Sequence, residues 1–176
     1  RGKAAADRTG RLLPILRRTP VEAFDRPTVC TGWTVRDVLA HSGCALTRAA
    51  EGRLHRFTPE LNQIDVDERR PWPLAQVLAE LEQGYGAAAA AMTAAGGELD
   101  GLALGEWIHG GDVREALGEP APYQSEGVED ALLLLVDRSR RPVINIRAEQ
   151  RGRQAQCASR SAGTCAASAV LIAAAC

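Results

Sequence analysis

The segment TGWTVRDVLAHSGCALTRAAEG, residues 31–52, carries the clearest helix signal in the chain. Thr34 precedes Asp37 by three residues, which is the spacing of a capping box with Asp in place of the usual Glu. Apolar residues then recur at intervals that place them on one face of a helix: Val35, Val38, Leu39, Ala45, Leu46 and Ala49. We therefore predict a helix from about Val35 to Arg53.

Four other segments show helical patterns. A short apolar patch at 12–16 ends at Thr19-Pro20, and 71–97 opens with Pro and closes on a Gly pair. A third helix is expected over about 101–117, with Gly118 as its C-terminal cap, and a fourth over 126–141. The residues between 53 and 71 are predicted to form a polar, charged loop. The sequence therefore predicts an all-α domain over 1–141.

The residues from 142 to 176 lose the amphipathic pattern. PVINIRA, residues 142–148, is the one plausible strand, and three of the five Cys follow it. We expect a short, poorly defined C-terminal extension that is a remnant of, or an altered, α/β segment.

Composition excludes several classes of protein. The 21 basic and 22 acidic residues leave a net charge of −1, which argues against a nucleic-acid binder. No segment reaches the roughly 18 to 20 apolar residues of a membrane span, and the first residues lack a signal-peptide core, so we expect a cytoplasmic protein. Five Cys without a CxxC pair predict reduced thiols. The bias toward Ala, Arg and Gly is typical of a high-GC genome.

Polar residues interrupt the core-facing side of two predicted helices. In GEWIHGGDVREALGEP, residues 105–120, Glu106 and His109 fall on a seam with apolar neighbours at spacings of three and four: Leu102, Val113 and Ala116. His41 lies on the apolar face of the helix that begins at Val35. A buried carboxylate is costly unless it is paired or bound to a metal. Two His and one Glu from two helices are a common divalent-metal set that leaves coordination positions open.

Packing explanations stand beside this interpretation. A His on an apolar face is more often a hydrogen-bonded core residue, and a Glu-His pair on one helix can be an intrahelical contact. Asp112 could orient His109 or pair with an Arg at the surface. Cys44 could be a thiolate ligand, although a small buried hydrophobic residue is the more common case.

Some further residues have no strong functional signal. His55, beside Arg53 and Arg56, fits a solvated residue at a helix end. Trp33, Trp72 and Trp107 fit core anchors as well as cavity walls.

Two separated motifs carry a family resemblance. CTGWTVRDVLAHSG, residues 30–43, and EWIHGGDVREALG, residues 106–118, resemble the paired signatures of the mycothiol-dependent maleylpyruvate isomerase family, within the DinB-like metal-binding superfamily. The resemblance covers roughly 8–141. It implies a DinB-like four-helix bundle with one divalent metal, usually zinc, held by residues that correspond to His41, Glu106 and His109. The family commonly places Glu four residues before His, whereas the gap here is three and Gly105 takes the other position.

The resemblance also implies chemistry. In the isomerase, the small thiol mycothiol coordinates the metal as a thiolate and adds to the cis double bond of maleylpyruvate, and rotation and elimination give the trans product. The family implies an isomerase or S-transferase from an actinobacterial source, with a small carboxylate as substrate. Asp112 and Arg114 are then candidate catalytic residues, and Arg114 or Arg36 could hold a substrate carboxylate.

Two alternatives stay open at this point. The chain could be a non-catalytic metal-binding bundle, as a monomer or a homodimer. It could also be a helical interaction module without metal, in which His41 and Glu106 are packed polar residues.

Overall fold

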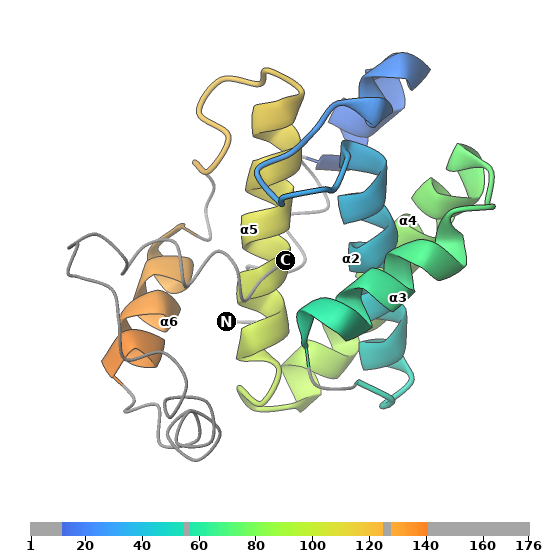
Figure 1. Ribbon diagram of the computed structural model, residues 1–176. Coiled ribbons are helices and arrows are strands. Elements are labelled where there is room, and N and C mark those ends of the chain that lie inside the picture. Colours follow the sequence, from blue (N-terminus) through green and yellow to red (C-terminus); the bar gives the residue numbers. More distant parts are fainter. Residues whose placement is uncertain (1–11, 55–56, 125–127, 141–176) are drawn as a thin grey trace, which may run out of the picture.

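The computed structural model describes residues 12–54, 57–124 and 128–140, with side chains described as far as residue 136 in the last range. Within these residues every regular element is a helix and no strand occurs (Figure 1). After a helical stretch over 12–18 come the 3₁₀ helix η1 (Val21–Asp25) and the α-helices α2 (Val35–Ala50), α3 (Pro59–Arg69), α4 (Leu74–Ala94), α5 (Asp100–Ala116) and α6 (Val128–Arg140). The all-α prediction is confirmed.

Helix α2 lies at the centre of the bundle and packs against α3, α4, α5 and η1 (Figure 1). The predicted capping box is present, because the Thr34 side chain accepts from the Asp37 amide and the Asp37 carboxylate accepts from the Thr34 amide. The helix ends near Ala50, slightly before the predicted Arg53, and Gly52 follows with a positive φ of 66°. Its N-terminal end is therefore fixed by the sequence motif that predicted it.

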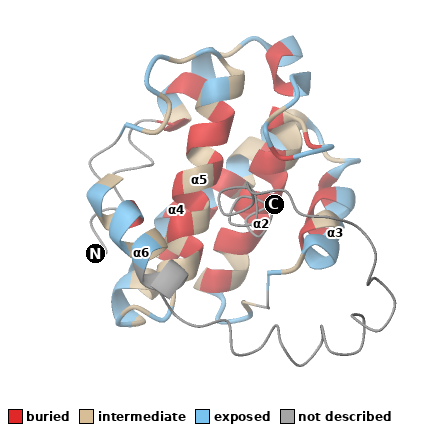
Figure 2. Ribbon diagram, turned by 60° about the vertical axis from the view of Figure 1, so that its left-hand side comes forward, coloured by how far each residue is buried: buried red, intermediate tan, exposed pale blue. Residues whose placement is uncertain are grey.

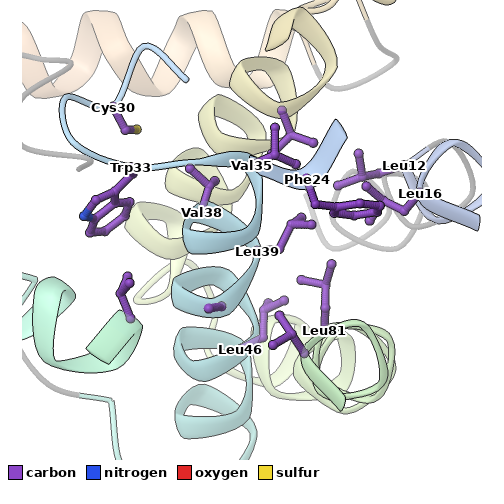
Figure 3. Packing of buried hydrophobic residues seen from close by; sticks show 14 of the residues in the cluster. Leu12, Leu16, Phe24, Cys30, Trp33, Val35, Val38, Leu39, Leu46 and Leu81 are labelled. Atoms are coloured by element: carbon purple, nitrogen blue, oxygen red, sulfur yellow. The ribbon is translucent and has the colours of Figure 1, made fainter. Parts of the chain in front are cut away.

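The main core lies between α2 and α4, closed at one end by η1 and the 12–18 helix. Figure 3 shows Leu46 of α2 and Leu81 of α4 together in this core, with Phe24, Leu12 and Leu16 at the other end. The two helices approach closely at Gly84, where an added Cβ would lie 2.9 Å from the Cβ of Leu46. The α2–α4 contact therefore depends on the missing side chain at this glycine.

Helix α3 corrects the prediction of a loop between residues 53 and 71. Thr58 caps the helix by accepting from the Leu61 amide, and Pro59 occupies its first turn. The buried face is mostly polar, whereas Leu61 and Ile64 are 36% and 47% exposed. The residues buried on this helix are Asn62, Asp65, Val66 and Arg69. Hydrophobic periodicity could not detect a helix in which Val66 is the one buried aliphatic residue and the rest of the buried face is polar.

Ion pairs fasten α3 to its neighbours. Arg69 donates to both carboxylate oxygens of Glu80 on α4, at 2.6 and 2.7 Å. Arg36 of α2 donates to backbone carbonyls of Arg69, Arg70 and Trp72 at the C-terminal end of α3. These contacts hold α3 in place without a large apolar interface.

Burial follows the same arrangement (Figure 2), with buried residues concentrated on the facing sides of α2, α4 and α5. Helix α6 packs on α5 through a small cluster that contains Leu104, Trp107 and Ala131. The predicted helices at 71–97, 101–117 and 126–141 correspond to α4, α5 and α6. None of the helices described is long and apolar enough to cross a membrane.

Three sequence predictions fall outside the described residues. These are the strand at 142–148, the C-terminal extension as a whole, and the position of His55. The division of the chain at residue 141 is therefore still a prediction.

Candidate metal centre

His41 is buried near the middle of α2, with 2% of its surface exposed. Its ring centroid lies 5.4 Å from that of His109 on α5, and the two rings are almost perpendicular. Trp33 and Phe57 flank the same imidazole, with ring centroids at 5.3 and 6.3 Å. The two histidines that the sequence placed on separate helices therefore meet inside the bundle.

Asp65 of α3 holds the other side of His41. The Nδ1 atom of His41 lies 3.2 Å from Oδ2 of Asp65, and Arg48 donates to Oδ1 of the same carboxylate. Burial raises the pKa of Asp65, but the hydrogen bonds from His41 and Cys44 and the charge of Arg48 outweigh it, so the pKa is lowered overall. An ionised carboxylate only accepts hydrogen bonds, so this contact is satisfied when His41 carries its proton on Nδ1.

The pKa of His41 is lowered, chiefly by burial. The hydrogen bond to Asp65 acts in the opposite direction, while the charge interactions with His109 and Arg48 lower the value further. A neutral imidazole with its proton on Nδ1 has its lone pair on Nε2. This is the form in which a His binds a metal.

His109 has a similar carboxylate neighbour. Its Nδ1 lies 3.6 Å from Oδ2 of Asp112, one turn along α5, and both residues are buried. The Tyr123 hydroxyl donates to Oδ1 of Asp112 at 2.6 Å. Burial and the bond to Asp112 raise the pKa of Tyr123, so its hydroxyl keeps the proton that it donates.

Gly111 makes room for Tyr123 on α5. A Cβ built at Gly111 would lie 2.2 Å from two atoms of the Tyr123 ring, so only glycine fits beneath the ring. The loop after α5 therefore holds Asp112 in place through this aromatic residue.

Glu106 is buried on α5, 5% exposed, and precedes His109 by three residues. The helical phase predicted that both residues face inward, and their burial agrees with that prediction. Whether Glu106, His41 and His109 bind one ion together remains a prediction.

The group of potential metal ligands that the described residues bring together shares only His109 with the predicted set. The ligand atoms of Cys30, His109 and Asp112 all lie within 4.8 Å of one another. These three residues form a candidate metal site within the described part of the chain. Cys30 lies in the segment before α2 (Figure 3). It is disulfide-bonded, so the expectation of reduced thiols is wrong for this residue and holds for Cys44.

Cys44 behaves as a packed residue. Its side chain is 1% exposed, and burial, reinforced by the nearby Asp65 charge, raises its pKa to about 12. A metal ligand or nucleophile would need the thiolate. These observations favour the packing interpretation of Cys44 over the ligand interpretation.

The two candidate arginines have backbone partners. Nε of Arg114 donates to the Gly110 carbonyl at 3.0 Å, which holds the start of the guanidinium along α5. Arg36 is engaged with the carbonyls at the end of α3. A role for Arg114 in substrate binding remains a prediction. The hydrogen bonds of Arg36 to the end of α3 give this residue a structural role.

Sequence reasoning missed Asp65, Tyr123 and Cys30 as residues of this region. The Thr58-Pro59 pair could have shown that Asp65 belongs to a helix, because Thr is a good N-cap and Pro is favoured in the first turn. Nothing in the sequence pairs Tyr123 with Asp112 across the end of a helix.

A comparison with protein families places this geometry in context. Residues 5–118 match the family described as the mycothiol maleylpyruvate isomerase N-terminal domain. The chain belongs to this family. The resemblance seen in the two motifs is therefore confirmed, and the match ends at Gly118, directly after α5. No curated protein and no solved structure matches the chain significantly.

Proposed function

We propose that the chain is a divalent-metal-dependent enzyme that uses mycothiol to isomerise a small carboxylate substrate or to transfer a thiol to it. The observation that carries the proposal is the pair of buried imidazoles, His41 and His109, whose ring centroids lie 5.4 Å apart. Each has a carboxylate beside its Nδ1. Family membership supports mycothiol as the thiol.

The residue types of the predicted set suit a divalent cation, most simply zinc. His41, His109 and Glu106 offer two imidazole nitrogens and one carboxylate, all buried and drawn from two helices. The alternative group with Cys30 is less suitable because a disulfide sulfur is not a thiolate. A bound divalent cation would supply the Lewis acidity that makes a coordinated thiol a thiolate near neutral pH.

The protein's own residues have distinct tasks in this proposal. Asp112 acts by orienting His109, because its other oxygen is already engaged by Tyr123. Trp33 and Phe57 shield His41 on the side where their rings lie. Arg114 is the candidate for holding a substrate carboxylate. The nucleophile is an external thiol, and neither Cys44 nor Cys30 is required in this role.

The remaining attributes follow from the family assignment and the sequence. We infer a cytoplasmic enzyme from an actinobacterial source, with a small-molecule thiol and a small-molecule substrate as partners, and with a homodimer as the expected assembly if it is not a monomer. The bundle over 1–141 would form the catalytic unit.

Metal content tests the proposal first. Protein purified without added metal is expected to contain close to one divalent ion per chain, measured by mass spectrometry of the metals. His41→Ala is expected to lose the ion and keep its helical circular dichroism. Cys44→Ala is the matched control, since it also alters a buried side chain on α2, and it is expected to retain the ion.

Mycothiol titration then separates an enzyme from a non-catalytic metal protein. Addition of mycothiol to the cobalt-substituted protein is expected to give a saturable sulfur-to-cobalt absorption band. Stoichiometric metal without any thiol response would favour the non-catalytic bundle. Unchanged metal content in His41→Ala would reject the ligand assignment.

A further inference from the structure

Asp65 stands out among the buried carboxylates because it comes from α3, a helix that contributes none of the predicted ligands. It is 3% exposed, and a buried carboxylate costs free energy unless its environment compensates. His41 contacts its Oδ2 and Arg48 contacts its Oδ1, while the Cys44 thiol also hydrogen-bonds the carboxylate. The His41 contact therefore does not compete with the ion pair.

The direction of the His41 contact has a chemical consequence. An imidazole has one donor and one acceptor nitrogen when neutral, and an acceptor-only carboxylate selects the tautomer with hydrogen on Nδ1. The lone pair is then on Nε2. Carboxylates commonly orient and polarise metal-bound histidines in this way, and losing such a partner typically costs about 10- to 100-fold in metal affinity.

Helix α3 is held so that Asp65 cannot easily move. Arg69, one turn after Asp65, forms the two-pronged ion pair with Glu80 of α4 and also donates to the Asp65 carbonyl at 3.2 Å. Trp33 Nε1 donates to Gln63 at 2.9 Å, which ties α3 to the segment before α2. These contacts fix the distance between α3 and His41.

We propose that Asp65 is a positioning residue of the metal centre, which accepts the Nδ1 proton of His41 and so keeps Nε2 of His41 available to the ion. This inference rests on the proposed function, and it assigns a task to a helix that carries no ligand of its own. Arg48 compensates the charge of Asp65 through Oδ1, and this ion pair does not involve Nε2 of His41, the nitrogen proposed to bind the ion.

The tautomer of His41 is the most direct test, and it needs no metal. Nitrogen-15 NMR of the metal-free, full-length protein is expected to show His41 with its proton on Nδ1. In Asp65→Asn the imidazole is expected to lose this strong preference. A wild-type His41 with its proton on Nε2 would overturn the inference even if no variant folds.

Metal affinity provides the second test. Zinc affinity, measured by competition with a chelator, is expected to fall about 10- to 100-fold in Asp65→Asn. Asp67→Asn is the matched control, since it makes the same change two residues away at an exposed position paired with Arg70 rather than with His41. The control is expected to keep the wild-type affinity.

Arg48→Gln distinguishes positioning from simple bracing of the fold. It removes the ion pair to Asp65 but leaves the contact between Asp65 and His41. If Asp65 only braces α3 against α2, Arg48→Gln will lose as much zinc affinity as Asp65→Asn, and the inference is then wrong. If positioning is correct, the loss will be clearly smaller and the Nδ1 tautomer will be retained.

The metal-binding measurements on the wild type and on Asp65→Asn also show whether the proposed function or only the role of Asp65 is wrong. A wild-type protein that binds neither zinc nor cobalt would refute the proposed function. A wild-type protein that binds zinc, together with an Asp65→Asn variant of equal affinity, would refute only the role given to Asp65. The visible absorption of cobalt-loaded protein gives an independent check, since a reoriented His41 is expected to change the ligand-field bands.

Discussion

Replacing Gly84 by Ala tests whether α2 and α4 approach as closely as the structure shows. The new Cβ would lie 2.9 Å from the Cβ of Leu46 and 3.4 Å from the Gly43 carbonyl oxygen. Two carbons normally stay about 3.5 to 4.0 Å apart, so one helix must move by roughly half an ångström or more. Since the Leu46 Cβ is attached directly to the backbone, a change of side-chain rotamer cannot relieve the clash.

The expected cost combines two opposing contributions. Overpacking of a tight core costs about 1–3 kcal/mol, while replacing Gly by Ala inside a helix contributes about 1 kcal/mol in favour of folding. Gly86→Ala on the same helix isolates the second contribution, because Gly86 is exposed and its added Cβ meets nothing within 4 Å. The difference between the two variants should therefore be about 1–3 kcal/mol.

Urea denaturation followed by circular dichroism measures this difference. Gly86→Ala is expected to be slightly more stable than the wild type, and Gly84→Ala clearly less stable than Gly86→Ala. For a chain of this size, each 1 kcal/mol corresponds to a shift of roughly 2–4 °C in Tm. Equal stabilities for the two variants, with unchanged m-values, would show that the helices are not in close contact at Gly84.

Three other predictions concern the site. Gly111→Ala should displace the Tyr123 ring and lower the free energy of unfolding by about 1–3 kcal/mol, because the hydrogen bond from Tyr123 to the buried Asp112 carboxylate is lost. In the same denaturation assay Gly110→Ala should be neutral or stabilising, because its new Cβ meets nothing within 4 Å. Because the pKa of Cys44 is raised from 9.0 to about 12, its reaction with iodoacetamide at pH 8 should be about 1000-fold slower in the folded protein than in urea. Peptide mass spectrometry follows the reaction, and a similar rate in both states would contradict the burial of Cys44. Glu106→Gln should lower zinc affinity by about tenfold or more without loss of helical structure, and full retention of affinity would remove Glu106 from the ligand set.

The sequence predicted the helices whose apolar residues form a stripe. In α2 the capping box and the buried residues Val35, Val38 and Leu39 agree with the pattern, because burial of an apolar face and the cap act together. Helix α3 could not be found by the same signal, since its buried side chains include Asp65 and Arg69. Tertiary ion pairs replace hydrophobic burial there.

The residues of the candidate site also fall into those that the helical pattern predicts and those that only tertiary packing brings together. Helical phase alone placed His41, Glu106 and His109 toward the interior, and all three are buried. Their carboxylate partners were harder to predict. Asp112 lies one turn from His109 and was recognised as a candidate, whereas Asp65 meets His41 only through the packing of another helix.

The position of Trp33 also makes the candidate centre optically accessible. Its indole ring lies 5.3 Å from His41 and is fixed by the hydrogen bond to Gln63. A paramagnetic ion such as cobalt or copper beside His41 would quench the fluorescence of this indole far more strongly than that of a distant one. In a protein with Trp72 and Trp107 replaced by Phe, the emission of Trp33 would report occupancy of the centre continuously, with no added dye and no assay of turnover.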